Sequence, residues 1–501
     1  MSTLIGIDIG TSGTKTLLID ETGKVLASAT REYPLSTPQP GWAEQEPEDW
    51  WQATVETIRE VIEKSGVAPK DVAGLGLSGQ MHGSVFLDGA NQVLRPALLW
   101  CDQRTQAQCD WITQAVGADE VVRITGNPVL TGFTAPKIIW LRDREPEAFA
   151  KVRKVLLPKD YVRYRLTGAF ATEVSDASGT SLLDVPKRQW SGEVLEAIGV
   201  PRAWLADVYE SQEISARLSE EAAQATGLLA GTPVAGGGGD QAAGAVGNGI
   251  VEPGIVSSTV GTSGVVFAFA EKPTIDPGRR VHTFCHAVPG TWHVMGVMLS
   301  AGGSLRWWRD VSGQTGYDGI NREAAEAPAG SEGLVFLPYL TGERTPYPDA
   351  NARGVFFGLS LRHGRPHLSR SVMEGVAYGL RDTFEIFGEM GVPITQVRAS
   401  GGGARSPLWR QIQADITGRE HVTINVDEGP GFGVALLAGV GVGIWNSVPE
   451  ACRATLKVVD STPADPAAHG TYDAFYSIYR KLYGDLKDTF ALDAEAVERT
   501  L

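Results

Sequence analysis

One pattern occurs twice in this chain, at a spacing of half its length. Residues 5–19 read IGIDIGTSGTKTLLI and residues 255–269 read IVSSTVGTSGVVFAF, so each is an apolar strand, a Gly-Thr-Ser-Gly turn and a second apolar strand. Two strands joined by a glycine-bearing turn form a β-hairpin. A recurrence at half of 501 residues indicates two related halves rather than an array of short repeats. The chain is therefore expected to fold as two similar units.

The segments around the first hairpin predict an α/β fold. Ile5, Ile7 and Ile9 alternate with Gly6 and Asp8, which is typical of a half-buried strand. Strand and helix patterns then alternate along the chain, which indicates α/β layering.

The glycine-rich stretch 231–250 separates the two hairpins and has the composition of a domain junction. We therefore expect an N-terminal domain over residues 1–245 and a C-terminal domain over residues 246–501.

Charge and cysteine content exclude several classes of protein. Lys plus Arg total 44 against 59 Asp plus Glu, a net charge of −15, which argues against nucleic acid or an anionic membrane as a partner. The four cysteines form no CxxC pair, and the first residues lack a secretory signal, so we expect a cytoplasmic protein. The longest stretch without Asp, Glu, Lys, Arg or His, 429–449, contains too many glycines for a membrane span and predicts a buried helix followed by a loop.

The two Gly-Thr-Ser-Gly turns are candidate phosphate sites. Backbone N–H groups and hydroxyls in a glycine turn form a concavity that suits an anion. The chain has no phosphate-loop sequence and no GxGxxG that opens a helix, so a nucleotide site would have to be built differently. Asp8, at the end of the first strand, would either support the turn or serve as an outer ligand of Mg²⁺.

Three further motifs are candidates for substrate or nucleotide contacts. Asp240 is the one charged residue of a neutral Gly-Ala tract, where it would be either a helix N-cap or a general base. Met81 and His82 follow a predicted strand, where α/β proteins place substrate contacts, although a loop histidine is more often structural. The glycine turn 400–406 precedes a predicted helix and could bring backbone close to a ligand.

The His and Cys residues clustered at 282–293 are candidate ligands of a metal ion. The expected strand alternation places Cys285 opposite His282 and His286, and no further cluster completes a tetrahedral set. We therefore expect no metal there.

Several motifs in order resemble the FGGY family of carbohydrate kinases, and within it the members that phosphorylate xylulose. These are DIGTSGTK (8–15), SGQMHG (78–83), LLWCDQR (98–104), TGFTAPKIIW (131–140), LLPKDYVRYRLTG (156–168), GGGGDQAAGAVG (236–247), VGTSG (260–264), FLPYLTGERTP (336–346), SGGGARS (400–406) and the run 354–375. The resemblance covers nearly the whole chain.

This resemblance implies two ribonuclease-H-like domains, as in actin and the heat-shock ATPases, with a deep interdomain cleft that holds ATP, Mg²⁺ and the sugar. Asp240 would be the general base, and Asp8 would help to position Mg²⁺. The other residues implied are Met81, His82 and Gln241 for the sugar, Thr11, Gly13, Gly261 and Thr262 for the phosphates, and Gly402, Gly403 and Ser406 for the adenosine.

The implied reaction is the ATP-dependent conversion of D-xylulose to D-xylulose 5-phosphate, with a homodimer as a compatible assembly. Gln241 and Cys101 stand where some members of the family have Asn, and both could alter the fit to the sugar. Two alternatives stay open: a family kinase for another substrate such as L-ribulose or glycerol, and an ATP-driven clamp without sugar chemistry.

Overall fold

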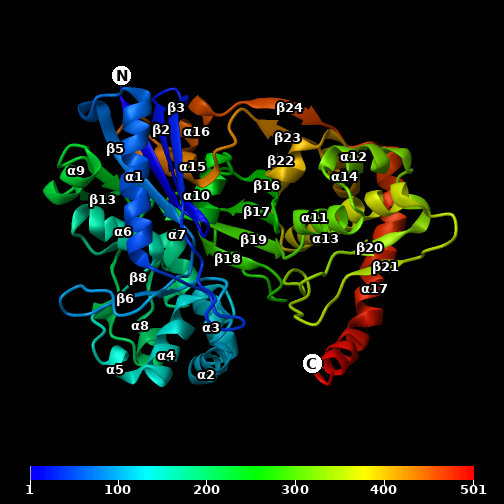
Figure 1. Cartoon of the computed structure of the whole chain (residues 1–501), viewed down its shortest axis with the longest axis horizontal. Helices are drawn as coiled ribbons and strands as arrows, with labels where there is room; N and C mark the ends of the chain where they lie inside the picture. The colour runs from blue at the N-terminus through cyan, green and yellow to red at the C-terminus, as the bar shows by residue number, and fades with distance from the viewer. Residues whose placement is uncertain (1, 501) are drawn as a thin grey trace.

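The computed structural model describes residues 2–500 and contains two large β-sheets (Figure 1). The first sheet has the order β13-β14-β5-β1-β2-β3, with β15 also paired to β5. Its strands are β1 (Thr3–Ile9), β2 (Gly13–Asp20), β3 (Val25–Glu32), β5 (Val72–Gly79), β13 (Ile214–Arg217), β14 (Pro233–Ala235) and β15 (Gly238–Gly239). The second sheet has the order β18-β19-β17-β16-β22-β23-β24. Its strands are β16 (Gly254–Val260), β17 (Gly264–Ala270), β18 (His282–Cys285), β19 (Trp292–Met298), β22 (Ile394–Ser400), β23 (His421–Ile424) and β24 (Val458–Thr462).

The two sheets share a core of five strands with the same topology. In each, a hairpin pairs antiparallel (β1–β2, β16–β17) and continues antiparallel into a third strand (β3, β19). The first hairpin strand pairs in parallel with a later strand (β5, β22), which pairs in parallel with the next (β14, β23). The strands outside this core differ, because the antiparallel edge strand β13 precedes β14 in the chain whereas β24 follows β23, and only the second sheet continues past its third strand, to β18. The shared core confirms the prediction of two related α/β units.

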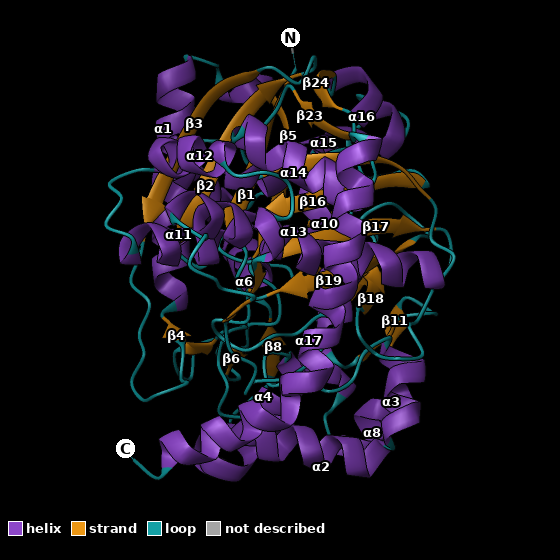
Figure 2. Ribbon diagram, turned by 90° about the vertical axis from the view of Figure 1, so that its right-hand side faces the viewer, coloured by secondary structure: helices purple, strands orange, loops and turns teal. Residues whose placement is uncertain are grey.

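Helices cover these sheets and fill the connections. In the first half they are α1 (Pro47–Ser65), α2 (Gln106–Val116), α3 (Ala118–Thr125), α4 (Thr134–Arg144), α5 (Pro146–Phe149), α6 (Pro158–Thr167), α7 (Val174–Ala177), α8 (Gly192–Ile198), α9 (Glu220–Thr226) and α10 (Asp240–Gly247). In the second half they are α11 (Gly302–Val311), α12 (Tyr317–Glu326), α13 (Arg365–Glu389), α14 (Pro407–Thr417), α15 (Gly429–Gly441), α16 (Val448–Thr455) and α17 (Pro466–Glu498). Figure 2 faces the second half, where α13 and α14 lie over the strands of the second sheet.

Short strands form small additional sheets outside the two large ones. They are β4 (Glu44–Gln45), β6 (Val85–Leu87), β7 (Ala97–Leu98), β8 (Lys154–Leu156), β9 (Ala171–Glu173), β10 (Leu183–Asp184), β11 (Gln189–Trp190), β12 (Asp207–Tyr209), β20 (Val335–Leu337) and β21 (Val355–Phe357).

Strand β1 is buried on both faces, whereas its sequence predicts a half-buried strand. Ile5, Ile7 and Ile9 pack into the core beneath α1, and Leu4 packs on the opposite side into the core that contains α15. Gly6 explains the difference, because a Cβ on this residue would lie 1.8 Å from the carbonyl oxygen of Gly431 in α15. The small residue lets a helix replace solvent on the second face of the strand.

Helices α10 and α15 pack against each other between the two sheets (Figure 1). The contact is close because a Cβ on Gly433 would lie 1.9 Å from the carbonyl oxygen of Ala243, and one on Gly247 would lie 2.3 Å from that of Gly429. The end of the glycine-rich stretch, within α10, is therefore a packing element and not only a junction.

Helix α15 was expected from the uncharged run 429–449, and a buried helix followed by a turn is confirmed there. It packs against β1 and β5 of the first sheet, although it lies late in the sequence. The division of the chain near residue 245 stays a prediction. Within residues 2–500, no helix combines the length and the apolar character that a membrane crossing needs.

The packing of α15 on α10 predicts that Gly433→Ala destabilises the protein. A methyl group at residue 433 would overlap a backbone carbonyl that cannot rotate away, so the helices would have to separate, at a cost of about 1–3 kcal/mol. Gly484→Ala is the matched control, since Gly484 lies within α17 with no atom near its Cβ position, and alanine should stabilise that helix by up to about 1 kcal/mol. Urea unfolding of both variants measures the difference, and equal midpoints would contradict this account of the packing.

Candidate active site

The predicted site residues of the first half follow three parallel strands that end at one edge of the first sheet. Asp8 in β1 is opposite Ser78 in β5, and Ser78 is opposite Gly238 in β15. The residues after these strands therefore emerge side by side, as the carboxyl ends of parallel strands do. The three emerging segments are Gly10–Gly13, Gln80–Gly83 and the first turn of α10, which begins with Asp240.

Asp8 and Asp240 are close enough for their charges to interact. Burial raises the pKa of Asp240 to about 7, with a further increase from the charge of Asp8, while hydrogen bonds from Gln241 oppose the shift. Burial likewise raises the pKa of Asp8 to about 6, against the nearby Ser78 hydroxyl and the attraction of Lys15. Carboxyl groups with perturbed pKa values are typical of functional sites.

The Asp8 carboxyl group fits a metal that brings most of its own ligands. Its Oδ1 atom is buried and has no hydrogen-bond partner among residues 2–500. No group of three or more His, Cys, Asp or Glu residues in that described range could hold a metal by itself. Mg²⁺ commonly uses one or two carboxylates together with waters and substrate phosphates, which agrees with this arrangement.

The histidines of 282–293 are buried, and two of them have hydrogen-bond partners. His282 contacts the side-chain oxygen of Asn127 through Nδ1 at 2.8 Å, and Nε2 of His286 contacts the carbonyl oxygen of Ile250 at 2.9 Å. β18 ends at Cys285, but the N–H of His286 continues the pairing by donating to the carbonyl oxygen of Thr291 at 3.0 Å. The ring of Phe284 lies against His282 and His293, and His286 also contacts His293, whereas Cys285 Sγ contacts the carbonyl oxygen of Val185, in agreement with the expected alternation. The absence of a metal there stays a prediction.

His82 is held in a fixed orientation. Its backbone has a φ of 70°, and its Nδ1–H donates to the carbonyl oxygen of Gly179 at 2.6 Å. Burial lowers the pKa of His82 to about 3, so the ring is neutral and Nε2 is left as an acceptor. The ring also stacks on Phe133 at a centroid distance of 4.5 Å. Because the ring is fixed, its Nε2 atom can accept a hydrogen bond from a hydroxyl group at one defined position.

Two side chains donate hydrogen bonds to the backbone carbonyl oxygen of His82. Lys137 Nζ donates to it at 2.9 Å, and Thr134 Oγ1 donates at 3.1 Å. Lys137 is fully buried, and burial lowers its pKa to about 7. Sequence reasoning missed this lysine, although it is the only charged residue between Gly132 and Leu141.

Met81 lies next to the candidate base. It is buried, and a Cβ on Gly239 would lie 2.9 Å from its Cγ atom. Gln241 follows Asp240 in α10 and is partly buried. The structure thus brings Met81, His82 and Gln241 to the same edge as Asp240.

Thr11 and Gly13 already have local partners. Thr11 Oγ1 donates to Gln80 Oε1 at 3.2 Å and accepts from the indole N–H of Trp100 at 2.9 Å. Gly13 is needed for strand pairing, because a Cβ there would lie 2.5 Å from the carbonyl oxygen of Arg31. Both residues shape the first turn, and a phosphate contact would come in addition to these roles.

The second sheet carries a cavity of about 390 Å³ at the equivalent edge. β16 and β22 end there side by side, with Thr259 opposite Ser400. The cavity is lined by all five predicted residues of this half and by others that the sequence did not indicate. The lining residues are Val260, Gly261, Thr262, Gly302, Leu305, Arg306, Tyr317, Asp318, Asn321, Gly402, Gly403, Arg405, Ser406 and Trp409.

One lining residue, Ser406, has a structural task as well. Ser406 caps α14 by accepting from the Trp409 N–H at 3.2 Å, and it donates to Asn321 Oδ1 at 2.9 Å. The cavity has the size and the mixed polar and apolar lining of a small-molecule site.

Comparison with known proteins agrees with this architecture. The N-terminal domain of the FGGY family of carbohydrate kinases matches residues 3–247, and its C-terminal domain matches residues 256–442. The chain is 43% identical over 483 residues to the xylulose kinase of Escherichia coli (strain K12), covering 96% of this chain and 99% of that protein. It is 40% identical over 491 residues to the xylulose kinase of Bacillus subtilis (strain 168), covering 97% and 98%.

A solved structure agrees as well. The crystal structure described as a xyloylose kinase from Brucella ovis is 39% identical, has a TM-score of 0.91 and covers 97% of this chain and 100% of that one. Matches over both halves, together with equivalent sheets and equivalent sites, show that this chain belongs to the FGGY family of carbohydrate kinases.

Proposed function

We propose that this carbohydrate kinase transfers the terminal phosphoryl group of ATP to D-xylulose and forms D-xylulose 5-phosphate and ADP. The observation that carries the proposal is the pair Asp8 and Asp240 at one sheet edge, each with a raised pKa. The names of relatives that match over nearly the whole chain support xylulose as the sugar.

Asp240 is the proposed general base. As the phosphoryl group approaches, the O–H bond of the sugar's terminal hydroxyl breaks, its proton moves to the Asp240 carboxylate, and its oxygen forms the new bond to phosphorus. The bond from phosphorus to the ADP oxygen breaks in the same step. The transition state of such a transfer is loose, so alignment and charge neutralisation contribute most of the rate.

The sugar would bind at the edge of the first sheet, and the nucleotide would bind at the edge of the second sheet. Met81, His82 and Gln241 would bind the sugar beside Asp240, with Nε2 of His82 accepting a hydroxyl hydrogen. The cavity of the second sheet would hold the adenosine beside Gly402, Gly403 and Ser406. The turns at Thr11, Gly13, Gly261 and Thr262 would lie along the phosphates in the cleft between the domains.

Asp8 is the residue that would hold Mg²⁺, through its unpartnered oxygen and bound water. When bound, Mg²⁺ neutralises phosphate charge. A cation beside Asp8 would also lower the pKa of Asp240, which favours the ionised base.

We also infer that the protein acts in the cytoplasm. All four cysteines are free and three are buried, which fits a reducing compartment.

A panel of sugars tests the substrate. We expect ADP release with D-xylulose to exceed that with L-ribulose, glycerol and a no-sugar control. Turnover that is highest with L-ribulose or glycerol would replace the proposed substrate within the family. ATP turnover that no sugar stimulates would favour the ATP-driven clamp.

Asp240→Asn should lower kcat by about 10²–10⁴-fold, because the amide keeps the size of the side chain but cannot accept the proton. Gln241→Asn is the matched control, since it changes the neighbouring residue and leaves the carboxylate in place. Steady-state kinetics with D-xylulose and ATP measure both variants. If Asp240→Asn keeps kcat within about tenfold of the unmodified protein, Asp240 is not the base.

The rate should also depend on pH in a defined direction. Only the ionised carboxylate accepts a proton, so kcat/KM should rise as pH increases through about 7 and fall below it. In the protein without Mg²⁺, Asp8→Asn removes a negative charge that raises the pKa of Asp240, so this pKa, followed by NMR of the Asp240 carboxyl carbon, should be lower in the variant. A pKa that stays in place or rises would contradict the coupling of the two carboxylates.

A further inference from the structure

A short buried segment lies directly behind the candidate site. It consists of α7 (Val174–Ala177) and the following turn, Ser178–Thr180, and all of its residues are buried. Its side chains and carbonyl groups contact the helix of the candidate base, the ring of His82 and the second sheet.

Ser175 contacts the residue that precedes the base. Its Oγ accepts a hydrogen bond from the backbone N–H of Gly239 at 3.1 Å, and Ser175 is fully buried. Gly239 is the N-cap of α10, and Asp240 is the first residue of that helix. The hydroxyl therefore fixes the peptide between Gly238 and Gly239, and the orientation of this peptide affects the direction of the Asp240 side chain.

Gly179 contacts His82 from the same segment. Its carbonyl oxygen accepts from His82 Nδ1 at 2.6 Å. A Cβ on Gly179 would lie 2.4 Å from the ring and 3.1 Å from Cε of Met81, so only glycine allows this approach. One segment thus fixes both the base and the candidate sugar contacts.

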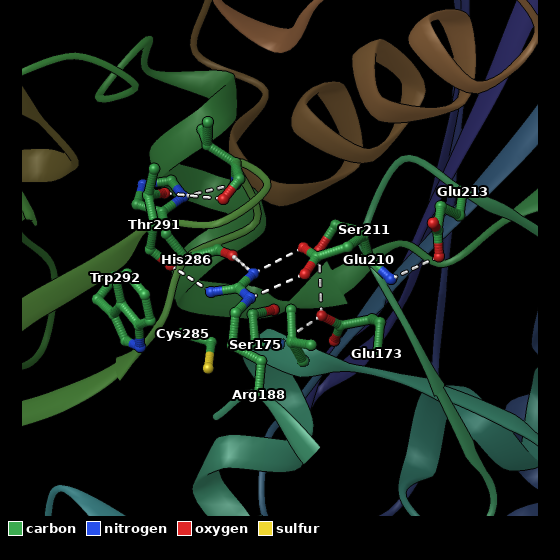
Figure 3. Close-up of polar contacts among 12 residues, drawn as sticks. Glu173, Ser175, Arg188, Glu210, Ser211, Glu213, Cys285, His286, Thr291 and Trp292 are labelled. Carbon is green, nitrogen blue, oxygen red and sulfur yellow. Dashed lines mark hydrogen bonds and ion pairs between the residues drawn. The ribbon is translucent and has the colours of Figure 1, made fainter. Parts of the chain in front are cut away.

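Buried charges stabilise this segment, and Figure 3 shows one of them, Glu173, near Ser175 and Ser211. The Glu173 carboxylate accepts from the N–H groups of Ser175 at 2.6 Å and Asp176 at 2.9 Å, and from the Ser211 hydroxyl at 3.1 Å. Lys159 Nζ lies 3.3 Å from Glu173 and 2.9 Å from Asp176. Lys159, Glu173 and Asp176 have no exposed surface, so their contacts are not screened by solvent.

The same segment also contacts the second sheet through Ser178. Its Oγ accepts from the N–H of Cys285 in β18 at 3.1 Å. The Ser178 hydroxyl also donates to the carbonyl oxygens of Val174 at 2.7 Å and Ser175 at 2.8 Å, so it supports the segment itself. Of the two hydroxyls, only that of Ser175 contacts the residue that precedes the base.

We propose that Ser175 is a positioning residue for phosphoryl transfer, whose hydroxyl holds the Gly239 peptide so that Asp240 points at the reacting hydroxyl. This inference rests on the proposed role of Asp240. Alignment of reacting groups has large effects on rate, since a displacement of about 1 Å can cost about 10²-fold.

Kinetics of two matched variants test the proposal. Ser175→Ala should lower kcat by about tenfold to 10²-fold and leave the KM for ATP within about twofold, because the base is misaligned and the nucleotide cavity is untouched. Ser178→Ala removes an equally buried hydroxyl of the same segment that does not contact Gly239, so it should lower kcat less than Ser175→Ala does. A fall in kcat of the same size in both variants, or in neither, would overturn the proposal.

Hydrogen exchange gives a readout that does not depend on the sugar. Ser175→Ala should speed exchange of the Gly239 amide by about tenfold, the loss of one hydrogen bond, whereas Ser178→Ala should speed exchange at Cys285 instead. If exchange at Gly239 responds but no sugar is phosphorylated by the unmodified protein, the contact stands and the proposed function fails. If exchange at Gly239 does not respond, the positioning role fails whatever the substrate.

Discussion

The close packing of α10 on α15 determines where the candidate site can form. Gly433 brings α15 against the carbonyl of Ala243, and Gly6 and Gly76 bring α15 against the first sheet. Helix α10 is held between the sheets in one orientation, and its first residue is Asp240. Larger side chains at these glycines would separate the layers and move the carboxylate away from Asp8. The position of the candidate base thus depends on close backbone contacts that begin one helical turn away from it, at Ala243.

The equivalent five-strand cores of the two sheets explain why the candidate site has two parts. Each sheet ends its hairpin strand and the neighbouring parallel strand at one edge, and loops from both strands emerge there. The first edge presents carboxylates and a neutral histidine, whereas the second presents glycine turns and a cavity. The residues at the first edge suit a molecule whose hydroxyl group receives the phosphoryl group, and those at the second edge suit a phosphorylated nucleotide. A phosphoryl transfer between the two edges is the chemistry that uses both.

Local sequence signals predicted most of the fold and part of the site. The repeated hairpins and the buried helix near 429–441 follow from periodicity and turn residues, which act over a few positions. The packing of α15 on the first sheet was not predictable in this way. Nor were the tasks of Lys137 and Ser175, because each depends on contacts between segments far apart in the chain.

The central claim is that the Asp240 carboxylate meets the hydroxyl that receives the phosphoryl group. A crystal structure of the protein with D-xylulose and a non-hydrolysable ATP analogue tests it most directly. The account predicts the terminal sugar hydroxyl at hydrogen-bond distance from Asp240, about 2.6–3.2 Å, and the analogue in the cavity beside Gly402 and Gly403. A sugar whose terminal hydroxyl contacts a different carboxylate, with Asp240 separated from it by protein atoms, would contradict the account.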